Sequence, residues 1–292
     1  MLSHIKREIP KMLDNILELK DNFDVFIFDI YGVIWDGKKL IPNSAETLAA
    51  LKVAGKKVII MSNGTETSDK VAERYGERGL LGGTHYDDVV SSGDVAYMVF
   101  SQDQRPLKYY FFGRPNPALF ADSCYQEVAT PQEADFIYIG VPQVLKDGVW
   151  HDVLTVEPFE QELKQFKELG KTLVCANPDL KAHEKTFADA VVRQGSIAAC
   201  YKQLQGDVAY FGKPYSAIFE YALQNESTPK ERILMIGDTL GTDILGGRDF
   251  GIKTALTLTG ISYEDMLAAG ESDIEAYAQE QNIVPDYFVR SI

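Results

Sequence analysis

Residues 23–33 read FDVFIFDIYGV, and this stretch decides the fold that we expect for the chain. Its apolar run stops at Asp29, is too short for a typical helix, and fits a strand buried on both faces of a parallel sheet. Asp29 then stands at the carboxyl end of the strand, where open α/β sheets bind their ligands. Gly32 follows and suits a tight turn or a backbone that closely approaches a ligand.

Strand and helix patterns alternate on both sides of a long central region. Residues 57–64 form a second apolar run that ends in a Ser-Asn-Gly turn, and residues 232–238 form another that ends in Asp238. This alternation predicts an α/β fold with a doubly wound parallel sheet and right-handed crossovers. The region between has strand and helix patterns of its own, including an aromatic run at residues 109–112 that we expect in its core.

The predicted organisation is a core in two parts with a second α/β domain inserted between them. The core takes residues 1–92 and 205–292, and the inserted domain takes residues 93–204. Residues 1–21 carry apolar side chains at helical spacing, so we expect an extra N-terminal helix packed on the core. We expect residues 254–258 to form the last strand of the sheet.

Composition restricts the class of function. The 292 residues carry a net charge of -14, which argues against nucleic acid or an anionic membrane as the main partner. The three cysteines include no CxxC pair, and no apolar stretch approaches the ~18 residues of a membrane span. We therefore expect a cytoplasmic protein with reduced thiols. A small anionic substrate remains compatible with this charge, because a site around a metal ion is locally positive.

Polar side chains recur where the predicted strands end. Asp29, Ser62 and Asp238 each end an apolar run, Lys213 precedes a helix, and Asp243 follows Asp238 by five residues. On a doubly wound sheet these positions converge at one edge. Carboxylates that meet there repel one another and usually share a cation, and all-oxygen ligands favour Mg²⁺. Each residue alone also fits an ordinary turn, cap or surface role, but together they predict a site for Mg²⁺ and a phosphorylated ligand.

Four motifs in this order resemble the haloacid dehalogenase-like (HAD) superfamily of aspartate-nucleophile hydrolases. They are FDIYGV at residues 28–33, MSNG at 61–64, GKP at 212–214 and IGDTLGTDI at 236–244. With ANPD at residues 176–179, the chain is similar to the class IIA, or NagD-like, branch. The resemblance spans nearly the whole chain and implies a Rossmannoid core with an inserted α/β cap of the C2 type.

The resemblance also implies a role for individual residues. Asp29 would attack phosphorus and form an aspartyl-phosphate, which is covalent catalysis by a carboxylate. Asn177 and Asp179 would lie on a cap loop that faces the substrate. The phosphoryl oxygens would be bound by Ser62, Asn63, Gly64 and Lys213, and Mg²⁺ by Asp29, the backbone carbonyl of Tyr31 and Asp238, with Asp243 in support.

One position departs from the family pattern. The family's phosphatases carry a second Asp two residues after the nucleophile as general acid and base, and this chain has Tyr31 there. A tyrosine with its ordinary pKa of about 10 is a poor base at neutral pH, and loss of a positioned acid or base lowers the rate by roughly 10²–10⁴-fold. Asp36 and His183 are two candidates to take over this role.

Three functions therefore stay open at the level of sequence. The first is a Mg²⁺-dependent phosphatase of a small phosphorylated metabolite, such as a sugar phosphate or nucleotide. The second is a phospho-ligand-binding or regulatory protein that has lost turnover. The third is a C–halogen hydrolase, because a halide leaving group needs no proton. Neither the physiological substrate nor the oligomeric state follows from the sequence.

Overall fold

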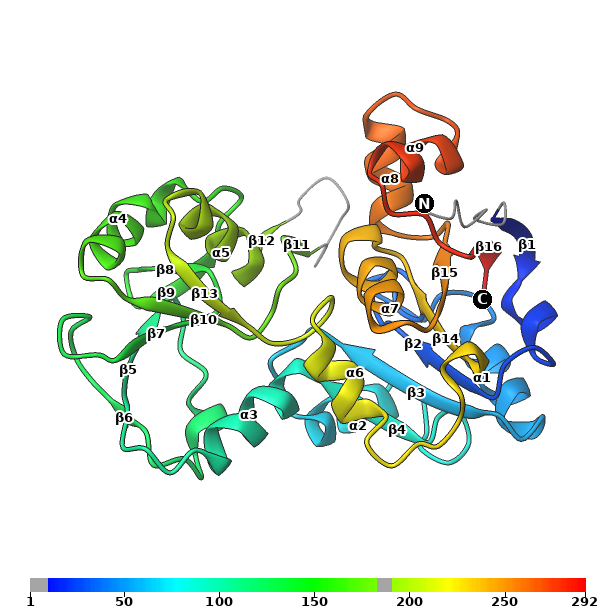
Figure 1. Ribbon diagram of the computed structural model, residues 1–292, viewed down its shortest axis with the longest axis horizontal. Helices are drawn as coiled ribbons and strands as arrows, with labels where there is room; N and C mark the ends of the chain where they lie inside the picture. The colour runs from blue at the N-terminus through cyan, green and yellow to red at the C-terminus, as the bar shows by residue number, and fades with distance from the viewer. Residues whose placement is uncertain (1–9, 183–190) are drawn as a thin grey trace, which may run out of the picture. The chain divides into compact units, whose positions relative to one another are not determined.

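The computed structural model describes residues 10–182 and 191–292 (Figure 1). The chain forms two compact units. The first comprises residues 1–61, 72–89 and 222–292, and the second comprises residues 62–71 and 90–221. The region predicted as an insertion, residues 93–204, lies inside the second unit, which also includes segments on either side of it.

The first unit is built on a seven-stranded sheet with the strand order β1-β16-β15-β14-β2-β3-β4. The pairings from β1 through β16, β15, β14 and β2 to β3 are all parallel, which confirms the predicted α/β class. The strands span, in chain order, Lys11–Asn15 (β1), Val25–Phe28 (β2), Lys57–Ser62 (β3), Asp88–Ser91 (β4), Ile233–Gly237 (β14), Lys253–Thr257 (β15) and Tyr287–Ser291 (β16).

Strands β2 and β14 lie side by side at the point where the strand order reverses. From β2 the chain continues outward to β3 and β4, and from β14 it continues outward in the other direction to β15 and β16. Phe28 pairs with Ile236, and the Asp29 N–H donates to the Ile236 carbonyl at 2.9 Å. Asp29 and Asp238 therefore follow the carboxyl ends of neighbouring strands, at the position where open α/β sheets bind ligands.

Burial explains why these strands read as continuous apolar runs. All four residues of β2 and all five of β14 are buried, as expected for a parallel sheet that is covered on both faces.

Among the described residues, five helices accompany the seven-stranded sheet. They span Ser44–Val53 (α1), Ser68–Gly76 (α2), Leu245–Phe250 (α7), Ile261–Ala268 (α8) and Ile274–Glu280 (α9).

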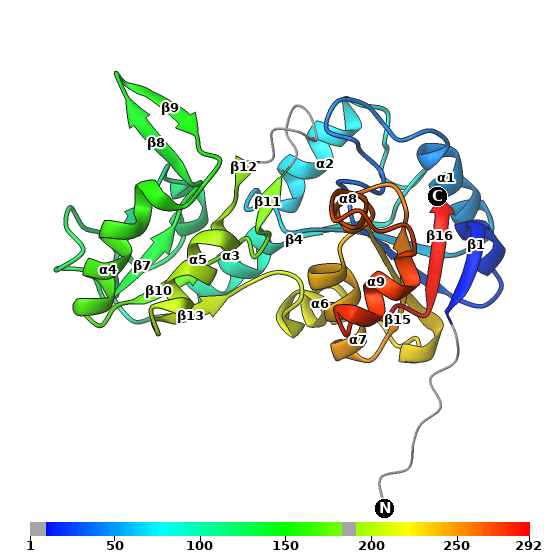
Figure 2. The same cartoon turned by 90° about the horizontal axis from the view of Figure 1, so that it is seen from above.

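Two expectations for the ends of the chain were wrong. Residues 11–15 form strand β1 and residues 16–19 a 3₁₀ turn, where a helix was expected. Residues 254–258 are not the last strand, because β16 follows and pairs in parallel with β1. Figures 1 and 2 both show β1 beside β16. The rest of the predicted N-terminal helix, residues 1–9, lies outside the described residues.

The second unit has its own parallel sheet of five strands, in the order β13-β10-β7-β5-β6. Tyr109 and Phe111 pack on one face of this sheet and Phe112 on the other, which confirms the expected aromatic core. The strands span Lys108–Phe112 (β5), Gln126–Glu127 (β6), Phe136–Ile139 (β7), Thr172–Cys175 (β10) and Asp207–Tyr210 (β13).

Helices and two short hairpins complete the second unit. The hairpin of β8 (Gln143–Lys146) and β9 (Val149–Asp152) extends away from the five-stranded sheet (Figure 2). A second antiparallel pair joins β11 (Lys181–Ala182) to β12 (Val191–Val192). The helices are Ser92–Gln102 (α3), Glu160–Glu168 (α4), Gln194–Gln203 (α5) and Ser216–Ala222 (α6). Across the described parts of the chain, no helix is long and apolar enough to span a membrane.

Candidate functional site

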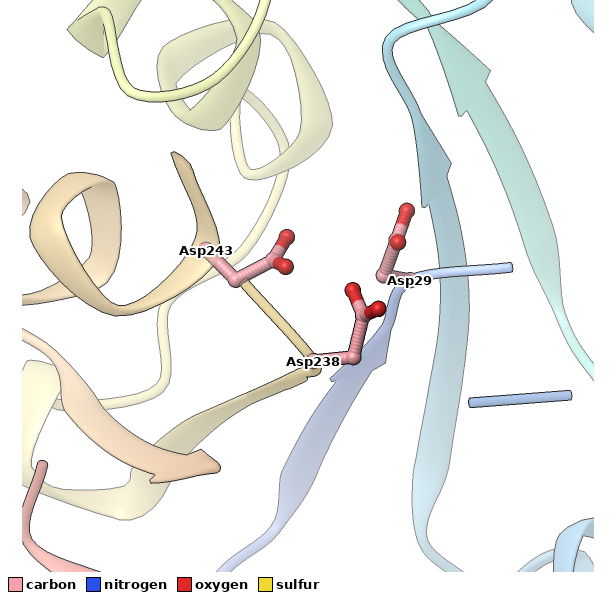
Figure 3. Close-up of side chains that lie close together, drawn as sticks. All are labelled: Asp29, Asp238 and Asp243. Atoms are coloured by element: carbon pink, nitrogen blue, oxygen red, sulfur yellow. The ribbon is translucent and has the colours of Figure 1, made fainter. Parts of the chain in front are cut away.

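Three carboxylates gather at the carboxyl ends of β2 and β14. Asp29, Asp238 and Asp243 each offer an oxygen atom, and these atoms all lie within 4.8 Å of one another. Figure 3 shows the three side chains together, with Asp29 after β2 and with Asp238 and Asp243 on the continuous segment that follows β14. Asp238 and Asp243 are buried, and Asp29 is partly buried. The first unit therefore brings together three of the residues that the sequence predicted for a metal site.

A π-helical turn brings Asp243 back to the end of β14. The turn spans Leu240–Ile244, and the Ile244 N–H donates to the carbonyl of Thr239 five residues earlier. Such turns are rare and occur frequently at functional sites. The Thr239 N–H donates to Asp243 Oδ2 at 3.1 Å, which fixes that carboxylate. Gly237 is needed directly beside it, because a Cβ atom there would lie 2.1 Å from the Asp243 side chain.

Two further glycines leave room for the Asp238 carboxylate. A Cβ atom on Gly32 would lie 2.2 Å from Asp238 Oδ2, and a Cβ atom on Gly260 would lie 2.0 Å from the same oxygen. Gly32 also has a φ of +75°, a conformation that other residues rarely adopt. Any larger side chain at either position would have to displace the carboxylate. The glycines next to the strand ends thus shape the site as directly as the acids do.

The electrostatics of Asp238 are unfavourable for a lone carboxylate. Burial raises the pKa of Asp238 well above its ordinary value, and the neighbouring charges of Asp29 and Asp243 raise it further. Two hydrogen bonds act in the opposite direction, from the Ile261 N–H at 2.7 Å and from the Thr239 hydroxyl at 2.9 Å. A protein region that buries acids beside one another in this way favours a cation between them.

The donor set fits a small, hard cation. All three side chains offer oxygen, the ligand that Mg²⁺ and Ca²⁺ prefer, and within residues 10–182 and 191–292 neither imidazole nor thiolate belongs to the cluster. A divalent ion would relieve the repulsion that raises the pKa of Asp238. The residues present are therefore compatible with the predicted Mg²⁺.

Tyr31 lies next to this cluster in sequence and is 42% exposed. Its phenol is close to buried Tyr75, whose pKa is raised mainly by burial and next by the neighbouring Tyr31. Trp35 packs edge-on against the ring of Tyr75, so Tyr75 contacts the loop that carries Tyr31 and Trp35.

Two other residues were considered as the missing acid. Asp36 accepts hydrogen bonds from the backbone N–H groups of Lys38 and Lys39 in its own turn. His183, the other candidate, lies outside the described residues.

The predicted phosphate-binding residues Ser62, Asn63, Gly64 and Lys213 all belong to the second unit. The Ser62 hydroxyl accepts from the Gly64 N–H at 3.1 Å, which closes the turn after β3. Lys213 is 2% exposed, and its backbone N–H donates to Asn63 Oδ1 at 2.7 Å. The structure thus joins the Ser-Asn-Gly turn to Lys213, although the two are about half the chain apart in sequence.

The loop with Asn177 and Asp179 also lies in the second unit and contacts Asn63. The Asn177 side chain accepts from the Asp179 N–H at 3.0 Å and so shapes the loop. The Asp179 carboxylate accepts from Asn63 Nδ2 at 2.8 Å. Cys175, which precedes the loop, is buried in the core of this unit, and burial raises the pKa of its thiol. That thiol is a structural group in a strand.

Sequence reasoning missed Ser92, which is fully buried at the start of α3. Its hydroxyl lies within hydrogen-bond distance of three carbonyl oxygens, at Asn63, Gly64 and Ala176. Nothing in the local sequence distinguishes it from Ser91, which caps the helix. Only the fold shows that Ser92 ties the Ser-Asn-Gly turn to the strand that precedes Asn177.

Comparisons with known proteins identify the family of the chain. A family model of haloacid dehalogenase-like hydrolases matches residues 26–124, and a HAD-hydrolase-like model matches residues 210–291. Human glycerol-3-phosphate phosphatase is 31% identical in an alignment that covers 92% of this chain and 88% of the relative. Phosphoglycolate phosphatase 2 of Arabidopsis thaliana is 27% identical over 97% of this chain and 96% of its own.

Solved structures show the same fold. A haloacid dehalogenase-like hydrolase from Brucella suis 1330 superimposes with a TM-score of 0.79, covering 96% of this chain and 99% of its own. Its sequence is only 24% identical, so this likeness concerns the fold alone. The matched segments and the solved structure therefore agree on the fold.

Proposed function

Because the chain belongs to the haloacid dehalogenase-like hydrolases, we propose that it hydrolyses a small phosphate monoester through an aspartyl-phosphate intermediate on Asp29. The observation that carries this proposal is the cluster of Asp29, Asp238 and Asp243 where the strand order reverses. The phosphatase relatives support phosphorus as the reacting atom. Their names suggest short phosphorylated metabolites as the substrate class.

The proposed reaction has two displacement steps. In the first, a carboxylate oxygen of Asp29 attacks phosphorus, an Asp29–phosphoryl bond forms, and the bond from phosphorus to the substrate oxygen breaks. The leaving alkoxide takes up a proton from the Tyr31 phenol or from water and departs as the alcohol. In the second, water attacks phosphorus and gives up a proton to solvent, the bond from phosphorus to Asp29 breaks, and the Asp29 carboxylate and inorganic phosphate are released. Ser62, Lys213 and the backbone amides of Asn63 and Gly64 would bind phosphoryl oxygens.

The proposed cofactor is Mg²⁺, held by Asp29, Asp238 and the Tyr31 carbonyl, with Asp243 in support. When bound, it would offset the negative charge of the phosphoryl oxygens and of the carboxylate that attacks them. Asp238 and Asp243 do not react themselves in this scheme. They would hold the cation next to Asp29.

Tyr31 supports a second candidate, a phospho-ligand-binding protein with little turnover. The leaving alkoxide needs a proton, and at this position the chain offers a phenol, which can donate a proton but is a poor base at neutral pH. A proton donor is then present for the first displacement, but a base that activates water is missing for the second. Under this alternative the binding residues keep their roles, and only hydrolysis of the intermediate is slow.

The test is phosphate release from p-nitrophenyl phosphate, glycerol 3-phosphate and phosphoglycolate, with Mg²⁺ or with EDTA. We expect Mg²⁺-dependent release by the wild type, its loss in Asp29→Asn, and faster turnover in Tyr31→Asp by ~10²-fold or more, the usual contribution of a positioned acid or base. No release by the wild type together with gain in Tyr31→Asp would favour the binding protein. Halide release from a 2-haloacid without Mg²⁺ would contradict both.

A further inference from the structure

The side chain of Asn63 connects two segments that lie far away in sequence. Its Oδ1 accepts from the Lys213 N–H at 2.7 Å, and its Nδ2 donates to the Lys213 carbonyl at 3.0 Å. The same Nδ2 donates its second hydrogen to Asp179 Oδ1 at 2.8 Å. Asn63 is 3% exposed, so these bonds form away from bulk water.

The three bonds fix the orientation of the Asn63 amide. A backbone N–H can only donate and a backbone carbonyl can only accept, so the Lys213 main chain admits just one orientation of the carboxamide. In that orientation both hydrogens of Nδ2 are already used. The side chain of Asn63 is therefore engaged by protein groups, and a phosphate contact at this residue has to come from its backbone.

Tight packing around the amide limits any movement. Gly212 has a φ of +92°, and a Cβ atom there would lie 2.7 Å from Asn63 Oδ1 and 3.0 Å from Pro178. The buried Ser92 hydroxyl donates to the Asn63 carbonyl at 3.0 Å, and Ser92 Cβ would lie 2.9 Å from the same Cβ atom on Gly212. The main chain of Lys213, the amide of Asn63 and the loop before Asp179 thus form one packed group.

We propose that Asn63 is a positioning residue that fixes the main chain of Lys213 and couples it to Asp179. This inference rests on the proposed function, in which Lys213 binds phosphoryl oxygens and the loop at residues 177–179 meets the substrate. A displacement of Asp179 would release one hydrogen of the Asn63 amide and loosen its hold on Lys213. The affinity of Lys213 for phosphate then depends on whether Asp179 is bound to the Asn63 side chain.

Hydrogen exchange at the Lys213 amide tests this inference without any activity. Asn63→Ala removes the acceptor of that N–H and should raise its exchange rate about five- to tenfold, the factor for one ordinary hydrogen bond. Asn63→Asp keeps the acceptor but loses both bonds that Nδ2 donates and places a carboxylate against Asp179, so its exchange should also rise. Asn116→Ala is the matched control, because Asn116 Nδ2 donates to the Thr65 carbonyl at 3.1 Å in the same unit.

The coupling is tested by combining variants. Asp179→Ala should raise exchange at the Lys213 amide in the wild type and have no further effect in Asn63→Ala, because coupled residues act non-additively. The KM for p-nitrophenyl phosphate should follow the same pattern, rising ~10-fold or more in Asn63→Ala, while Asn116→Ala stays near wild type.

Each result leads to a decision. Unchanged Lys213 exchange in Asn63→Ala, or additive effects of the two substitutions, would overturn the inference. If Asn63→Ala does not fold, Asp179→Ala alone decides, since it leaves both Lys213 bonds of Asn63 in place and must still raise exchange. A wild type without turnover would overturn the proposed function only, because the exchange experiment does not depend on hydrolysis.

Discussion

The two ends of strand β2 use the same residue type in opposite ways. Asp24 precedes the strand and forms ion pairs with Arg232 at 2.7 Å and with Lys56 at 3.3 Å. Asp29 follows the strand and lies beside two further acids, Asp238 and Asp243. Backbone hydrogen bonds of 2.9 Å hold both ends, from the Asp24 N–H to the carbonyl of Arg232 just before β14 and from the Asp29 N–H to the carbonyl of Ile236 within it.

The pKa values of Asp24 and Asp238 are shifted in opposite directions at the two ends of the strand. The Arg232 guanidinium lowers the pKa of Asp24 to about 2, so this carboxylate is more stable ionised in the folded protein than in the unfolded chain. Burial and neighbouring acids raise the pKa of Asp238, so its ionised form is less stable when folded. The ion pairs at one end of the strand favour the folded state, whereas the clustered acids at the other end oppose it. The three predictions below test this contrast, from the largest expected effect to the smallest.

The largest effect is expected from Mg²⁺ itself. At a concentration 100 times its dissociation constant, Mg²⁺ should stabilise the wild type by about 2.7 kcal/mol, measured as a rise in the thermal midpoint. Asp238→Asn should lose this rise, while its metal-free form should unfold at the same or a higher temperature than wild type because one buried charge is gone. Asp24→Asn should keep the full Mg²⁺ effect. If Mg²⁺ raised the thermal midpoint of Asp238→Asn as much as that of the wild type, Asp238 would not be a ligand of the ion.

The second prediction compares two glycines with nearly the same backbone. Gly32 has a φ of +75° and Gly55 a φ of +73°, but a Cβ atom on Gly55 meets nothing within 4 Å. Gly55→Ala should therefore lose roughly 1–2 kcal/mol of stability from the left-handed backbone, and Gly32→Ala should lose at least as much. Only Gly32→Ala should also weaken Mg²⁺ binding, about 10–100-fold, because it displaces Asp238. Calorimetric titration with Mg²⁺ distinguishes them, and equal affinities would contradict the assigned role of Gly32.

The smallest effect is expected at the ion-paired end. The Asp24 side chain is 45% exposed, so its pairing with Arg232 should contribute less than about 1 kcal/mol. Because its pKa is lowered on folding, this contribution is present above about pH 4 and disappears as the pH falls towards about 2. Urea unfolding of the wild type and Asp24→Asn at several pH values measures it. Activity should be unchanged, and a gap that widens on acidification would reverse the assigned sign.

Much of the core could be predicted from the sequence because its central strands are buried on both faces. The runs before Asp29 and Asp238 are continuous and apolar, so their position in a parallel sheet followed directly. Strands β1 and β16 could not be predicted in this way. They are short segments at opposite ends of the chain that pair with each other, and neither carries a local signal of its partner.

The candidate site also combines features that could be predicted from the sequence with features that could not. The acids could be predicted, because Asp29 and Asp238 each follow an apolar run and Asp243 follows Asp238 by five residues. The space that Gly260 leaves for Asp238, and the engagement of the Asn63 side chain by Lys213 and Asp179, could not. These contacts join residues that are far apart in the sequence, and no local pattern in the sequence indicates that they meet.

The central claim is that Asp29 carries a phosphoryl group during turnover, and trapping that group tests it most directly. The protein is mixed with p-nitrophenyl phosphate and Mg²⁺, quenched in acid within the first turnover, and its peptides are analysed by mass spectrometry. We predict a phosphoryl group on the peptide containing Asp29, with a longer lifetime if Tyr31 slows the second step, and none in the presence of EDTA. Phosphate release by an active protein whose Asp29 peptide is never phosphorylated would contradict the account.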